Sequence, residues 1–123
     1  MARVLVVDDE QSDRLILEKI LEQGDHEVYF ASDGEEAFKA YLKNRIEIII
    51  TDLNMPHVDG LEFIEAVLAL FPEAVIIAVS GKGPDELDAA QNAGARVALN
   101  KPIDPWELLK AILEVAPDSV TPS

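Results

Sequence analysis

The chain has 123 residues, of which 49% are hydrophobic, and its formal net charge is −14 at pH 7. Its length fits one domain, no apolar run approaches the roughly 18 residues of a membrane span, and the absence of cysteine excludes disulfides and thiolate metal sites. The negative charge disfavours binding to nucleic acid or to an anionic membrane and suits cations and basic protein partners. No signal-peptide pattern is present, so we expect a cytoplasmic domain.

Short apolar runs alternate with amphipathic segments along the whole chain. We expect strands at 3–7, 28–30, 46–52, 74–79 and 97–100, and helices at 11–23, 33–43, 59–70, 85–93 and 105–116. Such alternation predicts an α/β fold, a five-stranded parallel sheet with helices on both faces, doubly wound.

Local signals indicate where helices begin and which face they bury. Leu15, Ile16, Ile20 and Leu21 recur at helical spacing in the first helix. Ser32 and Glu35 have the spacing of a capping box, which predicts that Ser32 caps the second helix. Asp104 followed by Pro105 predicts the start of the last helix.

The run of β-branched residues from Ile48 to Ile50 predicts a strand that is buried on both faces, and Asp52 stands at its end. An ionisable group in that position is costly unless it meets a cation or takes part in a reaction. The alternative is that Asp52 only caps the following loop.

Polar side chains also follow the other central strands. In an open parallel sheet, ligands bind outside the carboxyl ends of the strands. The residues at or just beyond these ends are Asp8, Asp9, Asp52, Ser80 and Lys101. Four strand ends therefore bring three carboxylates, a hydroxyl and an ammonium to the same edge.

Carboxylates about 4 Å apart repel by roughly 4 kcal/mol per pair at an effective dielectric near 20. A divalent cation offsets this repulsion, and a set of oxygen ligands suits Mg²⁺. We predict that Asp8 or Asp9 binds Mg²⁺ together with Asp52, and that the backbone carbonyl of Asn54 is a further ligand. The alternative for Asp8 and Asp9 is a solvated turn that caps the first helix.

The same residue types can transfer a phosphoryl group. We predict that Asp52 is the nucleophile, because it stands alone at the end of the most buried strand. Lys101 would bind the phosphoryl oxygens, and Ser80 would donate a hydrogen bond to one of them. The alternatives are a strand-end turn residue for Ser80 and an ordinary surface lysine for Lys101.

Five motifs in this order resemble the receiver domain of response regulators over nearly the whole chain. They are Asp8-Asp9-Glu10, Asp52 to Pro56 with Asp59-Gly60, Ser80-Gly81, Gly94-Ala95 and Lys101-Pro102. The resemblance implies a flavodoxin-like fold with strand order 2-1-3-4-5, a receiver domain at 1–116 and a short polar tail at 117–123. It also implies a cis peptide bond before Pro102.

The resemblance further implies that Asp52 accepts phosphate from a phosphohistidine of a histidine kinase or phosphotransfer protein. The step would depend on Mg²⁺, with Mn²⁺ able to substitute, and the only catalysis would be self-catalysed phosphotransfer and slow autodephosphorylation. The phosphorylated state would change contacts with a downstream protein effector, because no DNA-binding module follows, unless the chain is part of a longer one.

One position departs from the family pattern. Receivers usually carry tyrosine or phenylalanine three residues before the lysine, and this chain has Ala98 there. The usual coupling between the hydroxyl residue and that ring is therefore missing, and we expect loop flexibility around Gly81 and Gly83 to substitute. Asn54 and Lys82 are expected to flank the path of the water that removes the phosphoryl group.

Three other classes of protein share part of this pattern. A haloacid-dehalogenase-like phosphatase would need a second aspartate two residues after its nucleophile, where this chain has Asn54. A flavodoxin would need a first loop that cradles phosphate, whereas Asp8-Asp9-Glu10 repels anions. A pseudo-receiver that binds partners without phosphorylation is the third reading, and it draws on Ala98.

Overall fold

The computed structural model describes residues 1–56 and 59–116, and in these residues five strands alternate with five helices. The strands are β1 (Arg3–Val7), β2 (Glu27–Ala31), β3 (Ile48–Asp52), β4 (Ile76–Ser80) and β5 (Val97–Asn100). The helices are α1 (Gln11–Gln23), α2 (Gly34–Lys43), α3 (Gly60–Leu70), α4 (Pro84–Ala93) and α5 (Pro105–Val115). All strand pairs are parallel and the order is β2-β1-β3-β4-β5, which confirms the predicted fold.

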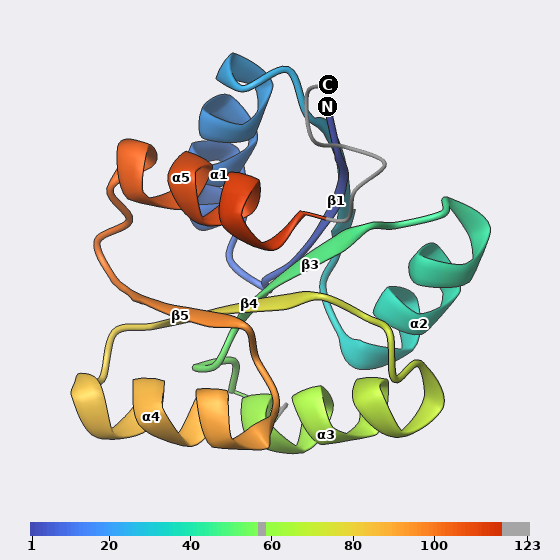
Figure 1. Cartoon of the computed structure of the whole chain (residues 1–123), viewed down its shortest axis with the longest axis vertical. Helices are drawn as coiled ribbons and strands as arrows, with labels where there is room; N and C mark the ends of the chain where they lie inside the picture. Colours follow the sequence, from blue (N-terminus) through green and yellow to red (C-terminus); the bar gives the residue numbers. More distant parts are fainter. Residues whose placement is uncertain (57–58, 117–123) are drawn as a thin grey trace.

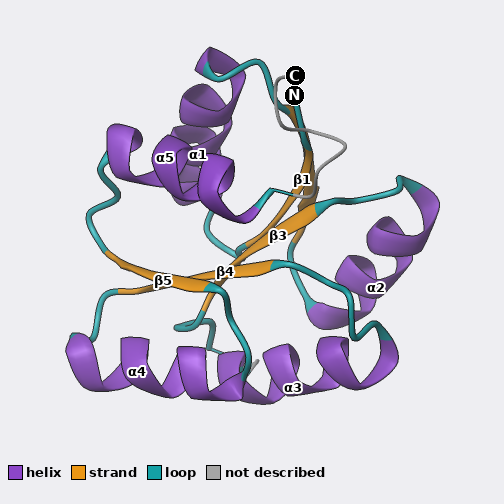
Figure 2. Ribbon diagram, viewed as in Figure 1, coloured by secondary structure: helices purple, strands orange, loops and turns teal. Residues whose placement is uncertain are grey.

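The helices form a layer on each face of the sheet. Helices α1 and α5 lie on one face, and α2, α3 and α4 lie on the other (Figures 1 and 2). Each layer encloses its own cluster of buried apolar side chains. The sheet therefore separates two apolar cores. Because helices cover both of its faces, a ligand can reach the sheet only at its edges.

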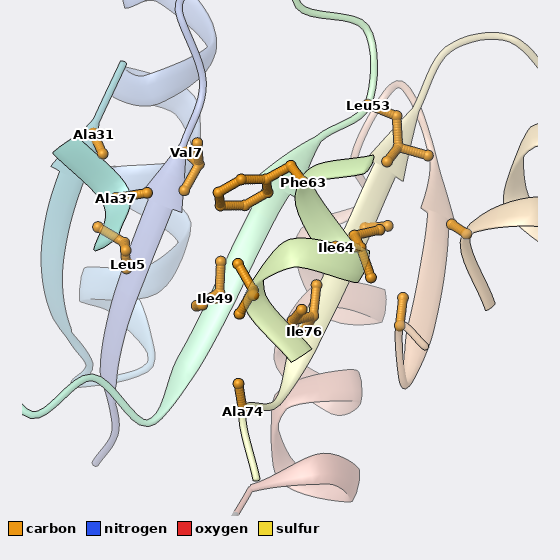
Figure 3. Packing of buried hydrophobic residues seen from close by; sticks show 14 of the residues in the cluster. Leu5, Val7, Ala31, Ala37, Ile49, Leu53, Phe63, Ile64, Ala74 and Ile76 are labelled. Atoms are coloured by element: carbon orange, nitrogen blue, oxygen red, sulfur yellow. The ribbon is translucent and has the colours of Figure 1, made fainter. Parts of the chain in front are cut away.

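Strand β3 shows how the isoleucine run serves both cores. Ile48 and Ile50 belong to the cluster under α1 and α5, whereas Ile49 belongs to the opposite cluster. On that side Ile49 lies near Phe63 and Ile64 of α3 (Figure 3). All five residues of β3 are buried, so the predicted two-faced burial is confirmed.

The buried face of α1 differs from the predicted one. Leu15 and Ile16 are 49% and 54% exposed, and the buried residues of the helix are Leu17, Ile20 and Leu21. The spacing 17, 20, 21 is that of one helical face. Leu15 points away from this face and Ile16 lies at its margin, because the packing of α1 on the sheet fixes the rotation of the helix through Leu17, Ile20 and Leu21.

The second helix begins one residue later than its predicted capping box. Asp33, and not Ser32, is the N-cap, and its carboxylate accepts the Glu36 N–H at 2.8 Å. The hydroxyl of Ser32 donates to the Glu36 carboxylate, so Glu36 takes the place predicted for Glu35. Aspartate and serine are equally good caps, and spacing alone does not rank them. The predicted cap at Asp104 is confirmed.

The peptide bond between Lys101 and Pro102 is cis, as the resemblance implied. The tail predicted at 117–123, and Pro117 as the stop of the last helix, lie outside the described residues. Within the described ranges no helix combines the length and the apolar character that a bilayer crossing requires.

Gly60, the first residue of α3, packs directly on the loop that follows β3. A Cβ atom at this position would lie 2.6 Å from the Leu53 Cα and 3.0 Å from the Leu53 carbonyl oxygen. Since backbone atoms cannot move aside cheaply, glycine allows α3 to start close to the carboxyl end of β3.

We expect Gly60→Ala to lower the free energy of unfolding by about 1–3 kcal/mol, because the added methyl group overpacks this contact. Gly34→Ala is the matched control. Gly34 is also the first residue of a helix capped by aspartate, and its Cβ would meet only ordinary contacts at 3.5 Å from Phe63. We expect that variant to stay within about 0.5 kcal/mol of the parent in urea unfolding. Equal effects of the two substitutions would contradict the proposed contact.

Candidate functional site

The candidate site lies at the carboxyl edge of the sheet, where four strands end. Asp8 follows β1, Asp52 ends β3, Ser80 ends β4 and Lys101 follows β5. Asp8, Asp52 and Ser80 are 2%, 6% and 0% exposed. Polar groups this deeply buried need hydrogen-bond or charge partners, and the structure supplies them.

Lys101 lies between two carboxylates. Its Nζ is 3.3 Å from Asp52 Oδ2 and 3.1 Å from Asp13 Oδ2. Burial alone would lower the pKa of the Lys101 ammonium, but the hydrogen bonds and charges of Asp13 and Asp52 outweigh it and raise the pKa above its ordinary value. The lysine is therefore held as a cation at the end of β3.

Asp8 has a carboxylate whose charged form is disfavoured by burial. Burial raises the pKa of its carboxyl from 3.8 to about 6; the Glu10 N–H, which donates to Asp8 Oδ1 at 2.9 Å, opposes this rise, and the charge of Asp52 adds to it. The carboxylate is thus a group whose charged form lacks enough compensation from the protein itself.

Among the described residues, the acidic groups that can share one metal ion are Asp8, Asp13 and Asp52, whose oxygens lie within 4.8 Å of one another. Three carboxylate oxygens form a hard donor set of the kind that Mg²⁺ prefers. Three carboxylates carry more negative charge than the single Lys101 ammonium beside them can neutralise. The residues present therefore fit a divalent cation.

Two predicted ligands are placed differently. Asp9 is exposed and does not belong to the group of three carboxylates. The Asn54 N–H donates to Asp52 Oδ1 at 3.0 Å, which fixes the loop after β3 around the carboxylate. The roles of Asp9 and of the Asn54 carbonyl as metal ligands stay predictions.

Ser80 is engaged on the opposite side from Lys101. Its hydroxyl donates to Glu86 Oε1 at 2.5 Å, and the Lys82 N–H donates to the Ser80 oxygen at 3.0 Å. The side-chain amide of Asn54 also donates to Glu86 Oε1, at 2.6 Å, and its carbonyl oxygen accepts the Gly81 N–H at 3.0 Å. Glu86 therefore joins the loops that follow β3 and β4.

The alternation of side chains explains this division. Ile50 and Val79 belong to the cluster under α1 and α5, and the residue two positions after Ile50 is Asp52. Ala78 belongs to the cluster under α2, α3 and α4, and Ser80 follows it by two positions. Asp52 is thus directed to the α1 side of the sheet edge and Ser80 to the α4 side.

A cavity of about 540 Å³ opens beside Asp52 on the α1 side. Ile16 and Leu17 of α1 line it on one side, and Pro102 and Ile103 line it on the other. The cavity therefore leaves open space next to the carboxylate of Asp52.

The sequence-based reading missed Asp13 and Glu86. Asp13 precedes Leu17 by four residues and Ile20 by seven, so it shares the buried face of α1 and turns toward the sheet edge. The prediction that Leu15 and Ile16 belong to the buried face obscured the spacing between Asp13 and Leu17. Glu86 lies in the first turn of α4, where an acidic residue is expected from the helix dipole alone and gives no distinguishing signal.

Comparisons with known proteins agree on one family. The family model described as the response regulator receiver domain matches residues 4–113. Chemotaxis protein CheY of Thermotoga maritima is 32% identical over 116 residues, which cover 93% of this chain and 97% of that protein. The solved structure of chemotaxis protein CheY4 of Vibrio cholerae has a TM-score of 0.83 and 36% identity, and covers 94% of this chain and 98% of that one.

Other relatives are much longer. The sensory/regulatory protein RpfC of Xanthomonas campestris pv. campestris is 28% identical over 119 residues, which are 93% of this chain and 16% of that protein. The chain therefore spans only a small part of the length of this relative.

The pKa of Asp8 leads to a test of the charge balance without metal. Because the pKa is raised from 3.8 to about 6, the folded state binds a proton more tightly than the unfolded state. Stability is therefore lost as pH rises from about 4 through 6, and the loss stays complete above 6. In EDTA at pH 7.5, we expect Asp8→Asn to raise the free energy of unfolding by roughly 2–3 kcal/mol.

Urea unfolding at pH 7.5 and 4.5 checks this expectation, since the gain should shrink at the lower pH. Asp9→Asn is the matched control, and its exposed position predicts a change within about 0.5 kcal/mol at both pH values. Adding Mg²⁺ should stabilise the parent and not Asp8→Asn. A loss of stability in Asp8→Asn at pH 7.5 in EDTA would refute the charge imbalance.

Proposed function

The chain belongs to the family of response regulator receiver domains of two-component systems, and on this premise we propose that Asp52 is its phosphoacceptor. The Asp52 carboxylate attacks the phosphorus of a phosphohistidine on a histidine kinase or phosphotransfer protein. An O–P bond forms while the P–N bond breaks, and the imidazole leaves with the electron pair. The observation that carries this proposal is the placement of the Asp52 carboxylate, buried at the end of β3 with its Oδ2 3.3 Å from Lys101 Nζ.

Lys101 and Ser80 have separate parts in the proposed step. The Lys101 ammonium neutralises charge on the transferring group, and its contact with Asp52 already puts it beside the reacting oxygen. The Ser80 hydroxyl donates a hydrogen bond to another phosphoryl oxygen. Support for this part comes from its burial at the neighbouring strand end.

The group of three carboxylates formed by Asp8, Asp13 and Asp52 supports a role for Mg²⁺. Asp8 and Asp52 are the ligands that burial and proximity favour, and Asp13 is the third member of their group. Asp9 and the Asn54 carbonyl remain ligands predicted from the sequence alone. When bound, Mg²⁺ neutralises negative charge on the phosphoryl oxygens, and Mn²⁺ accepts the same oxygen ligands.

The donor approaches through the cavity between α1 and the segment Pro102–Ile103. Its apolar walls suit the imidazole ring of a phosphohistidine, and Lys101 at its base suits the phosphoryl group. The phosphorylated form then changes contacts with a downstream protein. The net charge of −14 makes a nucleic acid an unsuitable direct partner.

We expect incubation with acetyl phosphate and Mg²⁺ to add the mass of one phosphoryl group to the intact protein. Asp52→Asn should abolish this adduct, because an amide is not a nucleophile of this kind. Asp88→Asn is the matched control, because Asp88 is an exposed residue of α4 outside the site, and it should keep the adduct. Intact-mass spectrometry measures all three proteins.

Two outcomes would contradict the proposal. No adduct on the parent protein would support a pseudo-receiver that binds partners without phosphorylation. Release of many phosphates per protein molecule each minute would support a phosphatase.

A further inference from the structure

We propose that Glu86 is a positioning residue that withholds the Ser80 hydroxyl from the phosphoryl site until Asp52 is phosphorylated. Phosphorylation then moves the hydroxyl from Glu86 to a phosphoryl oxygen and frees the first turn of α4. This inference rests on the proposed phosphorylation of Asp52, and it supplies the link to α4 that an aromatic residue at position 98 provides in other receivers.

The Ser80 hydroxyl has a single proton to donate. Its oxygen already accepts the Lys82 N–H at 3.0 Å, and its proton is directed to Glu86 Oε1 at 2.5 Å. A hydroxyl group donates a single hydrogen bond at a time. Ser80 therefore cannot serve a phosphoryl oxygen and Glu86 together, so the two states of Asp52 require two partners for Ser80.

The same Glu86 oxygen also binds the loop that follows Asp52. Asn54 Nδ2 donates to Glu86 Oε1 at 2.6 Å, and the backbone N–H of Asn54 donates to Asp52 Oδ1 at 3.0 Å. Hydrogen bonds to a carboxylate are stronger than those between neutral groups. Glu86 is thus connected to Asp52 through Asn54, while the same Glu86 oxygen accepts the Ser80 hydroxyl.

Glu86 also helps to hold the start of α4. Glu86 lies in the first turn of this helix, and Gly83, the N-cap, has φ 97° and makes no side-chain cap hydrogen bond. All ten residues of α4 are described, and Ala90 is the buried one among them. The contacts of Glu86 therefore hold an end of α4 that the apolar core holds weakly.

A phosphoryl group on Asp52 would also act on the Glu86 carboxylate through its charge. A phosphoryl group carries a charge of roughly −1.5 to −2 at pH 7. On Asp52 it competes with the Glu86 carboxylate for the same hydroxyl proton and repels that carboxylate. Both effects favour the separation of Glu86 from Ser80, so the phosphorylated state and the attached state of α4 exclude each other.

The position of Ala98 agrees with this role. Ala98 pairs with Ala78 in the sheet and packs against the core under α3 and α4, the face to which Ser80 is directed. A ring at this position would contact the same region of α4. Its methyl group is too short to relay a movement of Ser80, whereas Glu86 contacts Ser80 directly.

The experiment compares Glu86→Ala, Glu86→Gln and the control Asp85→Ala, which removes a neighbouring exposed carboxylate from the same helical turn. We expect Glu86→Ala to be phosphorylated by acetyl phosphate with Mg²⁺ about 3- to 10-fold faster than the parent, the range that one hydrogen bond accounts for. Glu86→Gln keeps an oxygen acceptor without the charge and should show a smaller acceleration. Asp85→Ala should match the parent.

A double-mutant cycle separates this role from a general loosening of the fold. The acceleration by Glu86→Ala should disappear in a Ser80→Ala background, because the hydroxyl that Glu86 withholds is then absent. An acceleration that persists in that background would overturn the proposal, and so would a Glu86→Ala or Glu86→Gln protein phosphorylated no faster than the parent.

Amide hydrogen exchange over residues 81–95 gives the second readout. Phosphorylation should speed exchange at the start of α4 in the parent, and Glu86→Ala should show the faster exchange already without phosphate. Unchanged exchange in the phosphorylated parent would overturn the release of α4. Failure of the proposed function itself is distinct, since the parent would then form no adduct that Asp52→Asn abolishes.

Discussion

Repulsion among carboxylates at the carboxyl edge of the sheet is the constraint on which the rest of the site depends. Asp8, Asp13 and Asp52 lie within 4.8 Å of one another, and Lys101 contacts two of them. The apolar strands β1 and β3 place two of these charges where water cannot screen them. The fold therefore maintains a local excess of negative charge, and this excess supports the proposed binding of a divalent cation.

Most of the fold was predictable because its signals are local and repeated. Each strand is a short apolar run, and the alternation with helices leaves few sheet topologies. The strand order itself followed from the resemblance to receiver domains. The isoleucines from Ile48 to Ile50 identified the central strand, and Asp104 identified the start of α5. The errors fell where two neighbours have equal propensities, as with Ser32 and Asp33 at the start of α2.

The site was predictable to the extent that it is built from strand ends. Asp8, Asp52, Ser80 and Lys101 meet because parallel strands end at a common edge. Asp13 and Glu86 come from helices, and their direction depends on how each helix is rotated against the sheet. That rotation is set by tertiary packing. In α1, the helical spacing indicates the correct buried face only when Leu17 is counted among the buried residues.

The sheet also divides the site between its two faces. Asp52 with Lys101 and Asp13 lies toward α1, and Ser80 with Glu86 lies toward α4, because adjacent positions along a strand alternate. In the proposed function, the surface for the phosphate donor and the surface at α4 therefore contain different residues. Over evolutionary time, a lineage can exchange one partner for another by changing one helical layer while the other layer keeps its own specificity.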